Sequence, residues 1–165
     1  MIEAVIFDLD GTLITLPLNY EEELLPRFSK VTEIENMHPL TEKISKLDPK
    51  KKEKVFEIWN EAERKALEKM TVSNKGKTLY NKHLDKPKAL VTLQGKPVVK
   101  NILENLDLHF DFIVTREDSL HRTEQLQIAL RKLRKPAQNV LFIGNTTGDS
   151  VAAKAVGCQF LRVEQ

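Results

Sequence analysis

From Lys88 onward, short β-branched apolar runs alternate with segments whose apolar residues recur at helical spacing. This alternation constrains the fold more than any other feature, because it is typical of parallel strands joined by crossover helices. We expect strands at 89–93, 110–115, 139–143 and 159–163, and helices at 98–106, 123–133 and 149–156. Gly157 follows the last helix as an expected C-cap. The predicted fold class is therefore α/β, with a parallel sheet covered by helices on both faces.

Another apolar run, residues 3–7, lies at the amino end and is followed by Asp8-Leu9-Asp10-Gly11-Thr12. It is typical of a buried strand, and Gly11 gives the backbone the freedom to end that strand sharply. Asp8 and Asp10 then lie at the carboxyl end of the strand, where open α/β sheets bind their ligands. Two nearby carboxylates repel each other unless a cation or a proton offsets their charge. The pattern predicts a magnesium site and a carboxylate nucleophile.

The segment between these two regions, residues 16–84, is charge-rich and favours helices. Asp48-Pro49 is typical of a helix start, with an acidic N-cap followed by proline. The apolar face of the helix that follows would consist of Val55, Ile58, Trp59, Ala62, Ala66 and Met70. We also expect a helix over 20–25 that is capped by Asn19 and ended or kinked by Pro26, and a short helix ending near residue 47. The predicted organisation is a core of residues 1–15 and 85–165, interrupted by a helical insertion at 16–84.

Composition excludes several classes of partner. The 26 basic residues nearly balance the 24 acidic ones, so the net charge of +2 gives no field that would recruit nucleic acid. No run approaches the roughly 18 apolar residues of a membrane helix. The single cysteine, Cys158, cannot form an intrachain disulfide. A strand at the amino end leaves no room for a signal peptide, so we expect a cytoplasmic protein, monomeric or homodimeric, without nucleic-acid or membrane partners.

The string Phe7-Asp8-Leu9-Asp10-Gly11-Thr12 resembles the first motif of the haloacid dehalogenase superfamily, whose members are mostly phosphohydrolases. The helical insertion lies where one type of this family carries a cap. The resemblance implies a Rossmann-like core with a small α-helical cap, and Mg²⁺ as cofactor. It also implies that Asp8 attacks a small phosphorylated metabolite to form an aspartyl phosphate, with Asp10 as general acid and base.

The later motifs match this family less completely. Thr92 occupies the second-motif position at the end of a strand, where its hydroxyl would bind a phosphate oxygen or simply pack. In the last motif, Asn145 replaces the first of two acids and Asp149 supplies the second. The resemblance implies Asp8, Asp10, Asn145 and Asp149 as metal ligands. An amide oxygen brings no charge, so metal affinity should fall. A turn role for Asn145 and a helix-capping role for Asp149 remain open.

The third motif departs furthest from the family, which usually places a lysine, often followed by proline, before the last motif. No Lys-Pro pair occurs in residues 117–124, where Arg122 is the nearest cation, with Arg116 behind it. Arginine holds phosphate in a bidentate fork, so Arg122 is a candidate phosphate ligand. An ordinary surface role for Arg122 is the alternative.

Three functions are compatible with these motifs. The expected one is a magnesium-dependent phosphohydrolase. The alternative is a catalytically weak or inactive module that binds phosphate or a protein, which Asn145 and the missing lysine support. A phosphomutase would use the same residues and differ in how the cap excludes water. Dehalogenation is less expected, because enzymes with that activity lack the acid that Asp10 supplies here.

Overall fold

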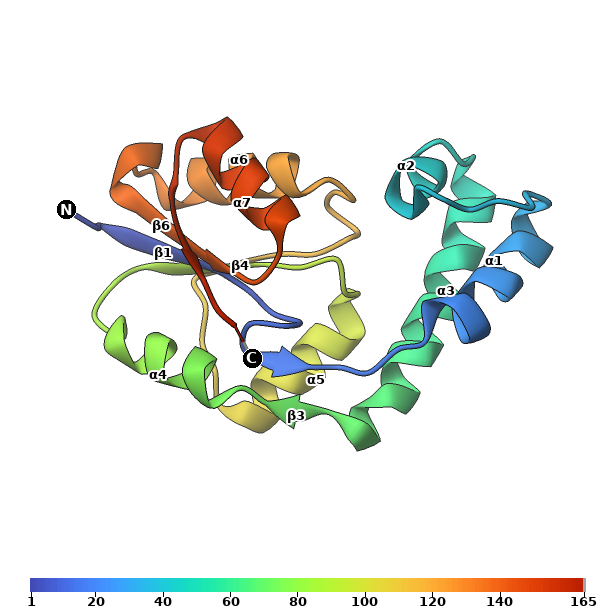
Figure 1. The fold of residues 1–165 in the computed structure, drawn as a ribbon, viewed down its shortest axis with the longest axis horizontal. Coiled ribbons are helices and arrows are strands. Elements are labelled where there is room, and N and C mark those ends of the chain that lie inside the picture. Colours follow the sequence, from blue (N-terminus) through green and yellow to red (C-terminus); the bar gives the residue numbers. More distant parts are fainter. Residues whose placement is uncertain (165) are drawn as a thin grey trace.

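The computed structural model describes residues 1–164 and contains a five-stranded sheet in the order β5-β4-β1-β6-β7 (Figure 1). The strands are β1 (Ala4–Asp8), β4 (Lys88–Val91), β5 (Phe112–Val114), β6 (Val140–Gly144) and β7 (Gln159–Arg162). Each neighbouring pair is parallel. This confirms the predicted α/β class.

Strand β1 is central and pairs with β4 on one side and β6 on the other. Asp8 lies opposite Val91, and Phe7 lies opposite Ile143, so the carboxyl ends of the three strands meet at one edge. The chain continues from β4 toward one edge of the sheet and from β6 toward the other. This change of direction is the topological switch point at which open α/β sheets bind ligands.

Two pairs of helices cover the sheet, one on each face (Figure 1). The helices are α4 (Asn74–Lys82) and α5 (Lys96–Leu106) on one face, and α6 (Arg122–Leu133) and α7 (Thr147–Val156) on the other. Alternate side chains of β1 point to opposite faces, because successive strand residues alternate. Val5 and Phe7 therefore join the α4–α5 cluster, whereas Ile6 joins the α6–α7 cluster.

Residues 20–66 form a separate group of helices, which we call the helical insertion. It consists of a π-helical turn (Tyr20–Leu24), α1 (Leu25–Thr32), α2 (Leu40–Ser45) and α3 (Pro49–Ala66). Asn19 and Asp48 cap their helices as predicted. The helical turn over Tyr20–Leu24 ends just before Pro26, as expected, and a second helix begins there. Pro26 lies in the first turn of α1, where the missing N–H has no intrahelical partner to lose.

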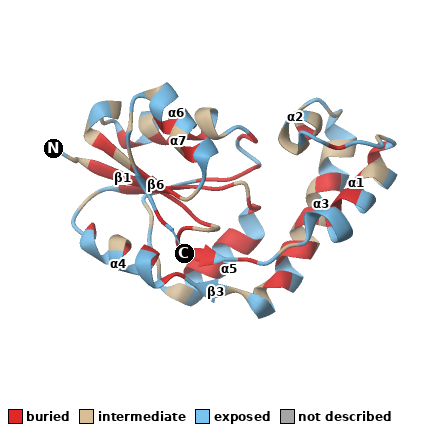
Figure 2. Cartoon of the chain, in the orientation of Figure 1, coloured by how far each residue is buried: buried red, intermediate tan, exposed pale blue. Residues whose placement is uncertain are grey.

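The helical insertion has its own buried cluster, and Figure 2 shows this cluster apart from the buried strands of the sheet. Two short strands, β2 (Ile14–Thr15) and β3 (Thr71–Val72), pair antiparallel where the chain leaves and re-enters the sheet region. Helix α4 falls inside the insertion expected at 16–84. However, the ring of Tyr80 on α4 packs against the ring of Phe7 on β1, with 6.1 Å between the ring centroids. We therefore propose that α4 belongs with the core, while the expected boundary at residue 84 stays a prediction.

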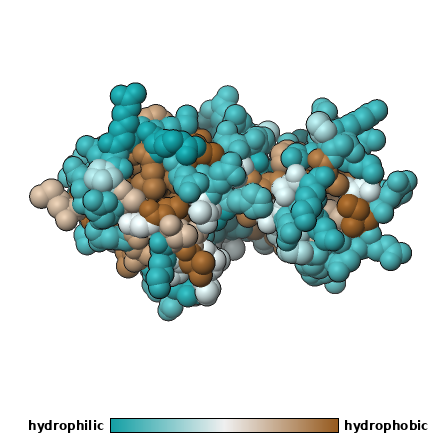
Figure 3. Space-filling model, turned by 90° about the horizontal axis from the view of Figure 1, so that it is seen from above, coloured by the Kyte–Doolittle hydropathy of each residue, from teal (hydrophilic) through white to brown (hydrophobic). Residues whose placement is uncertain are grey.

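The face of the molecule that is seen from above in Figure 3 is largely polar. In this view hydrophilic side chains cover most of the sheet region and of the helical insertion, and apolar side chains form patches on both (Figure 3). Among residues 1–164, no helix has both the length and the apolar character needed to cross a membrane.

Candidate active site

Asp8 is the last residue of β1, and its side chain is buried at the carboxyl edge of the sheet. Arg122 donates from Nη2 to Oδ1 of Asp8 at 3.0 Å, and the Thr12 hydroxyl donates to Oδ2 at 3.4 Å. Burial raises the pKa of Asp8 from 3.8 to about 7, against the opposing effect of Arg122, while Asp149 raises it further. The carboxyl group is thus fixed in orientation and titrates near neutral pH.

Asp10 lies two residues further on, where the chain turns away from the sheet. Its Oδ1 accepts a hydrogen bond from the backbone N–H of Leu16 at 2.9 Å. Burial raises the pKa of Asp10, although hydrogen bonds from the backbone of Leu16 and Gly11 lower it. Gly11 adopts φ of +86°, a conformation that favours glycine. Asp10 is therefore a half-buried carboxyl group with an increased affinity for a proton.

Arg122 begins α6 and joins the two acidic motifs. Its Nε donates to Oδ1 of Asp149 at 3.0 Å, and its Nη1 donates to Gln125 at 2.7 Å. Gln125 in turn donates to the backbone oxygen of Thr92 at 2.8 Å. The structure therefore places Arg122 beside the predicted nucleophile rather than on the open surface. Its role as a phosphate ligand stays a prediction, because its guanidinium here pairs with two carboxylates.

Asp149 completes a capping box at the start of α7. Its N–H donates to the Thr146 hydroxyl at 2.9 Å, while its Oδ2 accepts from the backbone N–H groups of Asn145 and Thr146. Its other oxygen, Oδ1, accepts from Arg122. Both oxygens of Asp149 thus have protein partners. The capping role left open by the sequence is observed, with Thr146 as the N-cap itself, and metal ligation by Asp149 stays a prediction.

Asn145 follows β6 and packs against the loop that carries Asp10. A Cβ on Gly11 would come within 2.0 Å of Asn145 Nδ2, so the two loops are in close contact. The Oδ1 atom of Asn145 is buried and accepts no hydrogen bond from the protein. Burial of such an oxygen without a partner costs free energy, and a hard cation would supply one. Together with the carboxylates of Asp8, at the end of β1, and Asp10, on the loop that Asn145 packs against, this oxygen gives donors of the kind that magnesium prefers.

No group of three or more His, Cys, Asp or Glu side chains within residues 1–164 is arranged to hold a metal ion. A magnesium ion at this edge of the sheet would therefore depend on the Asn145 amide in addition to the carboxylates. This makes the donor set less charged than one built from acids alone, and we expect correspondingly weaker binding.

Thr92 is buried directly after β4, one residue beyond the partner of Asp8 in the sheet. Its hydroxyl accepts from the backbone N–H of Gln94 at 3.1 Å and donates to the Gln94 amide oxygen at 3.4 Å. The structure thus brings Thr92 to the same edge as Asp8, with its hydroxyl in a local turn. Phosphate binding by Thr92 stays a prediction.

A buried ion pair between Glu63 of α3 and Arg116, near this edge, was not predicted from the sequence. Both side chains are 0% exposed, and Arg116 Nη1 lies 2.8 Å from Glu63 Oε2. The Arg116 guanidinium also lies 4.2 Å from the ring centroid of Trp59. Glu63 lies four residues after Trp59 and therefore on the apolar face of α3. A charged residue on that face indicates a buried partner of opposite charge.

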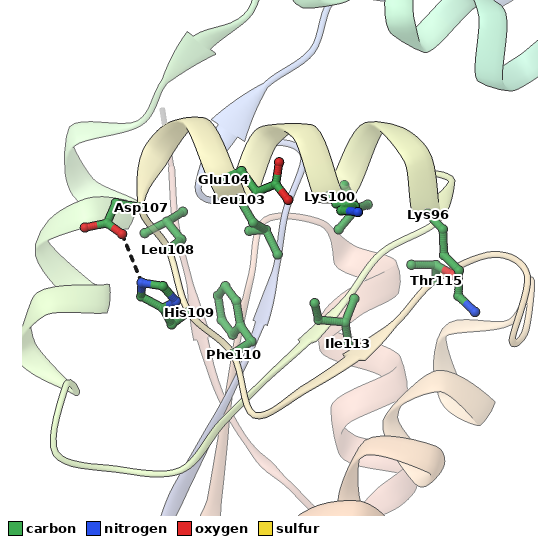
Figure 4. Close-up of a pocket in the computed structure, with 11 residues that line it drawn as sticks. Lys96, Lys100, Leu103, Glu104, Asp107, Leu108, His109, Phe110, Ile113 and Thr115 are labelled. Atoms are coloured by element: carbon green, nitrogen blue, oxygen red, sulfur yellow. Dashed lines mark hydrogen bonds and ion pairs between the residues drawn. The ribbon is translucent and has the colours of Figure 1, made fainter.

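The groove shown in Figure 4 lies elsewhere, between α5 and β5, and measures about 660 Å³. Leu103, Phe110 and Ile113 form its apolar wall, and Lys96 and Lys100 lie toward one end. None of the predicted site residues lines it. We therefore do not assign the groove to the candidate active site.

The family model of haloacid dehalogenase-like hydrolases matches residues 5–163, and the chain therefore belongs to this family. No curated protein sequence matches the chain significantly.

Several solved structures share the fold. A haloacid dehalogenase-like family hydrolase from Streptococcus pneumoniae is 20% identical with a TM-score of 0.69, over 98% of this chain and 84% of that one. CbbY from Rhodobacter sphaeroides, solved in complex with phosphate, is 18% identical with a TM-score of 0.69, over 97% and 85%. A predicted phosphatase from Clostridium acetobutylicum is 18% identical with a TM-score of 0.67, over 98% and 84%.

Proposed function

We propose that the protein is a magnesium-dependent phosphohydrolase that acts on a small phosphorylated metabolite through an aspartyl phosphate on Asp8. One observation carries this proposal. The carboxyl group of Asp8 is buried at the end of the central strand, oriented by Arg122 and Thr12, with Asp10 two residues away. A nucleophile needs a fixed orientation and a nearby acid, and this arrangement supplies both.

In the first step, a carboxylate oxygen of Asp8 attacks phosphorus while the bond from phosphorus to the leaving oxygen breaks. Asp10 gives its proton to that leaving oxygen, so the product departs as an alcohol. Burial raises the pKa of Asp10 in the metal-free protein, which favours the protonated form, and a bound magnesium ion would oppose this effect. General acid catalysis of this kind contributes about 10²–10⁴-fold to the rate.

In the second step, a water molecule attacks the phosphorus of the aspartyl phosphate, and Asp10 accepts its proton. The bond between phosphorus and Asp8 breaks, which releases inorganic phosphate and restores both carboxyl groups. Thr92 and Arg122 would bind the phosphoryl oxygens, for which the planar fork of arginine is well suited. Arg122 already lies 3.0 Å from Asp8, the site of attack.

Asp8, Asp10, Asn145 and Asp149 would hold the magnesium ion, and the three aspartates would have to move closer together than they are among the described residues of this structure. When bound, the ion neutralises charge between the carboxylates and the phosphoryl group. The buried oxygen of Asn145, which lacks a hydrogen-bond partner, supports this assignment. Asp149 would have to exchange part of its bonding to Arg122 for the metal, since both of its oxygens now have partners.

A second function has its own supporting observation. Arg122 bridges Asp8 and Asp149 at 3.0 Å each, so the acids are compensated by the protein itself. A catalytically weak or inactive module that binds phosphate or a protein would need nothing more. A phosphomutase is also compatible with these residues, because it would differ only in the acceptor of the phosphoryl group.

Hydrolysis of p-nitrophenyl phosphate, with magnesium and with excess EDTA, tests the proposal on wild type and Asp8→Asn. We expect metal-dependent turnover that Asp8→Asn abolishes. Absence of turnover by folded wild-type protein on a panel of phosphomonoesters would favour the binding module. Turnover that persists in Asp8→Asn would contradict the assignment of the nucleophile.

A further inference from the structure

The loop at 92–95, which carries the proposed phosphate ligand out of β4, is held by two buried side chains from other parts of the chain. Arg116 donates from Nη1 to the backbone oxygen of Leu93 at 3.1 Å. The backbone N–H of Gly95 donates to Oε1 of Glu63 at 3.2 Å. Glu63 belongs to α3 in the helical insertion, so the insertion binds the loop directly.

These two side chains form one bidentate ion pair. Arg116 donates to both carboxylate oxygens of Glu63 at 2.8 Å, and it also donates to the Asn60 side chain. Removing two charges from water is costly, and well-packed apolar residues often stabilise a fold as well as a buried pair does. Stability alone therefore does not account for this pair. What apolar residues would not reproduce is its directed bonding to the backbone at Leu93 and Gly95.

The contact between α3 and this loop also depends on a residue without a side chain. A Cβ on Gly95 would come within 2.2 Å of the Asn60 oxygen and 2.6 Å of Arg116 Nη2. On the neighbouring loop, Leu120 packs into the buried cluster of the helical insertion. The loops after β4 and β5 thus both pack against the helical insertion. The position of α3 therefore fixes the backbone at Leu93 and Gly95, next to Thr92.

We propose that Glu63 and Arg116 are positioning residues: their ion pair holds the 92–95 loop to α3 and thereby keeps Thr92 where it binds the phosphoryl group. The phosphate-binding part of this inference rests on the proposed function, whereas the holding of the loop does not. The orientation of the helical insertion and the shape of the phosphate site are then coupled through one buried pair.

The test compares two double variants that each remove an ion pair from α3. Glu63→Leu with Arg116→Met removes the buried pair but keeps apolar volume. Glu61→Leu with Arg27→Met removes an exposed pair between α3 and α1, whose side chains are 38% and 45% accessible, and serves as control. Glu63→Gln is a third variant that keeps the size of the side chain. Circular dichroism and a cooperative unfolding transition establish that each is folded.

The first readout is the affinity for inorganic phosphate, measured by calorimetry in the presence of magnesium. We expect the dissociation constant to rise about tenfold or more in the buried-pair variant and to stay unchanged in the control, because a misplaced ligand loses most of its contribution. Thr92→Val should weaken binding in wild type but add little in the buried-pair variant. Additive effects of the two changes, or unchanged phosphate affinity, would overturn the proposal.

The second readout does not depend on phosphate. Hydrogen exchange of the Gly95 amide, followed by NMR without ligand, should be about tenfold or more faster than in the control when Glu63 is replaced by leucine. The increase should be smaller for Glu63→Gln, whose amide oxygen can still accept from this N–H. If wild type binds no phosphate while this amide is released, the proposed function fails and the holding of the loop stands. Unchanged exchange in the folded variants would contradict the proposal whatever the protein binds.

Discussion

At the scale of single residues, the pKa of Asp8 results from two opposing effects, burial and the neighbouring charge of Arg122. Asp8 is removed from water at the end of β1, and only Arg122 and hydrogen bonds favour its ionised form. Burial prevails, so the pKa of Asp8 rises to about 7. A buried aspartate with a pKa of about 7 can act as a nucleophile only in its ionised form. A cation bound beside it would lower this pKa and so favour loss of the proton.

The first prediction concerns pH and the stability of the metal-free protein. Since the pKa of Asp8 rises from 3.8 to about 7 on folding, the folded state binds the proton more tightly across this interval. Stability should therefore fall as pH rises through it, by at most about 4 kcal/mol for roughly three pH units. Asp8→Asn should reduce this slope. Urea unfolding in EDTA at pH 4.5, about 0.7 unit above the lower end of the interval, and at pH 8, about 1 unit above its upper end, measures the loss of stability. An equal loss in wild type and Asp8→Asn would contradict this prediction.

Asn145 provides the second prediction. Asn145→Asp should tighten magnesium binding by about tenfold, because a negative charge replaces a neutral amide among the ligands. The metal concentration that gives half-maximal turnover measures the effect. Asn36→Asp adds the same charge at an exposed position of the helical insertion and serves as control. Equal metal dependence in wild type and Asn145→Asp would remove Asn145 from the ligand set.

At the scale of elements, the site is formed by loops that pack against one another after β1, β4 and β6. The loop after β1 has room for Asn145 only because Gly11 lacks a side chain. Gly148, in the first turn of α7, lies in a different situation, since a Cβ there would meet only the Thr146 hydroxyl oxygen, at 3.6 Å. A side chain at position 11 would therefore overlap Asn145, whereas one at position 148 has room.

This difference gives a matched pair of substitutions. Gly11→Ala should destabilise the fold by about 1–3 kcal/mol, because alanine is strained at positive φ and its Cβ displaces Asn145. Gly148→Ala should leave stability unchanged or raise it by about 0.5–1 kcal/mol, as expected for alanine in a helix. Urea unfolding of both variants measures the changes. A Gly11→Ala protein as stable as wild type would contradict the packing of the two loops.

The sequence predicted most elements of the core because each has a local signal. Alternating apolar runs marked the strands, and Gly157 marked the end of α7, where it adopts φ of +89°. Strand β5 is shorter than the expected 110–115, because Asp111 instead binds the backbone N–H of Lys88. Local patterns did not show that α4 packs under the sheet, since this depends on Tyr80 meeting distant aromatic rings.

The same holds for the candidate site: residues with a local sequence signal were predicted, and contacts between distant residues were not. Asp8 and Asp10 were found from one strand end, and the structure places the less certain Arg122 beside Asp8. The Glu63–Arg116 pair was not found, because its partners lie 53 residues apart on different elements. The capping of α7 by Thr146 was likewise hidden by the resemblance, which directed attention to Asp149 as a metal ligand.

At the scale of the whole molecule, the sheet and the helical insertion each bury their own apolar cluster. They are joined by the short β2–β3 pair and by the bonds of Glu63 and Arg116. Opening this joint would break the hydrogen bonds of this pair and expose the apolar side chains of Trp59 and Leu120, which pack beside it, to water. The two parts should therefore unfold together.

The protein has a single tryptophan, Trp59, which lies in the helical insertion and allows this expectation to be tested. We predict that Trp59 fluorescence and far-ultraviolet circular dichroism report the same unfolding midpoint in urea, within about 0.2 M, as for a two-state domain. A fluorescence transition that clearly precedes the loss of ellipticity would show that the insertion unfolds on its own.

The central claim is that Asp8 receives a phosphoryl group. Its most direct test is mass spectrometry of protein quenched in acid during turnover of a phosphomonoester with magnesium. The account predicts one added phosphoryl group, located on Asp8 in the amino-terminal peptide and absent in Asp8→Asn. Turnover without a phosphorylated form, or phosphorylation of another residue, would contradict it.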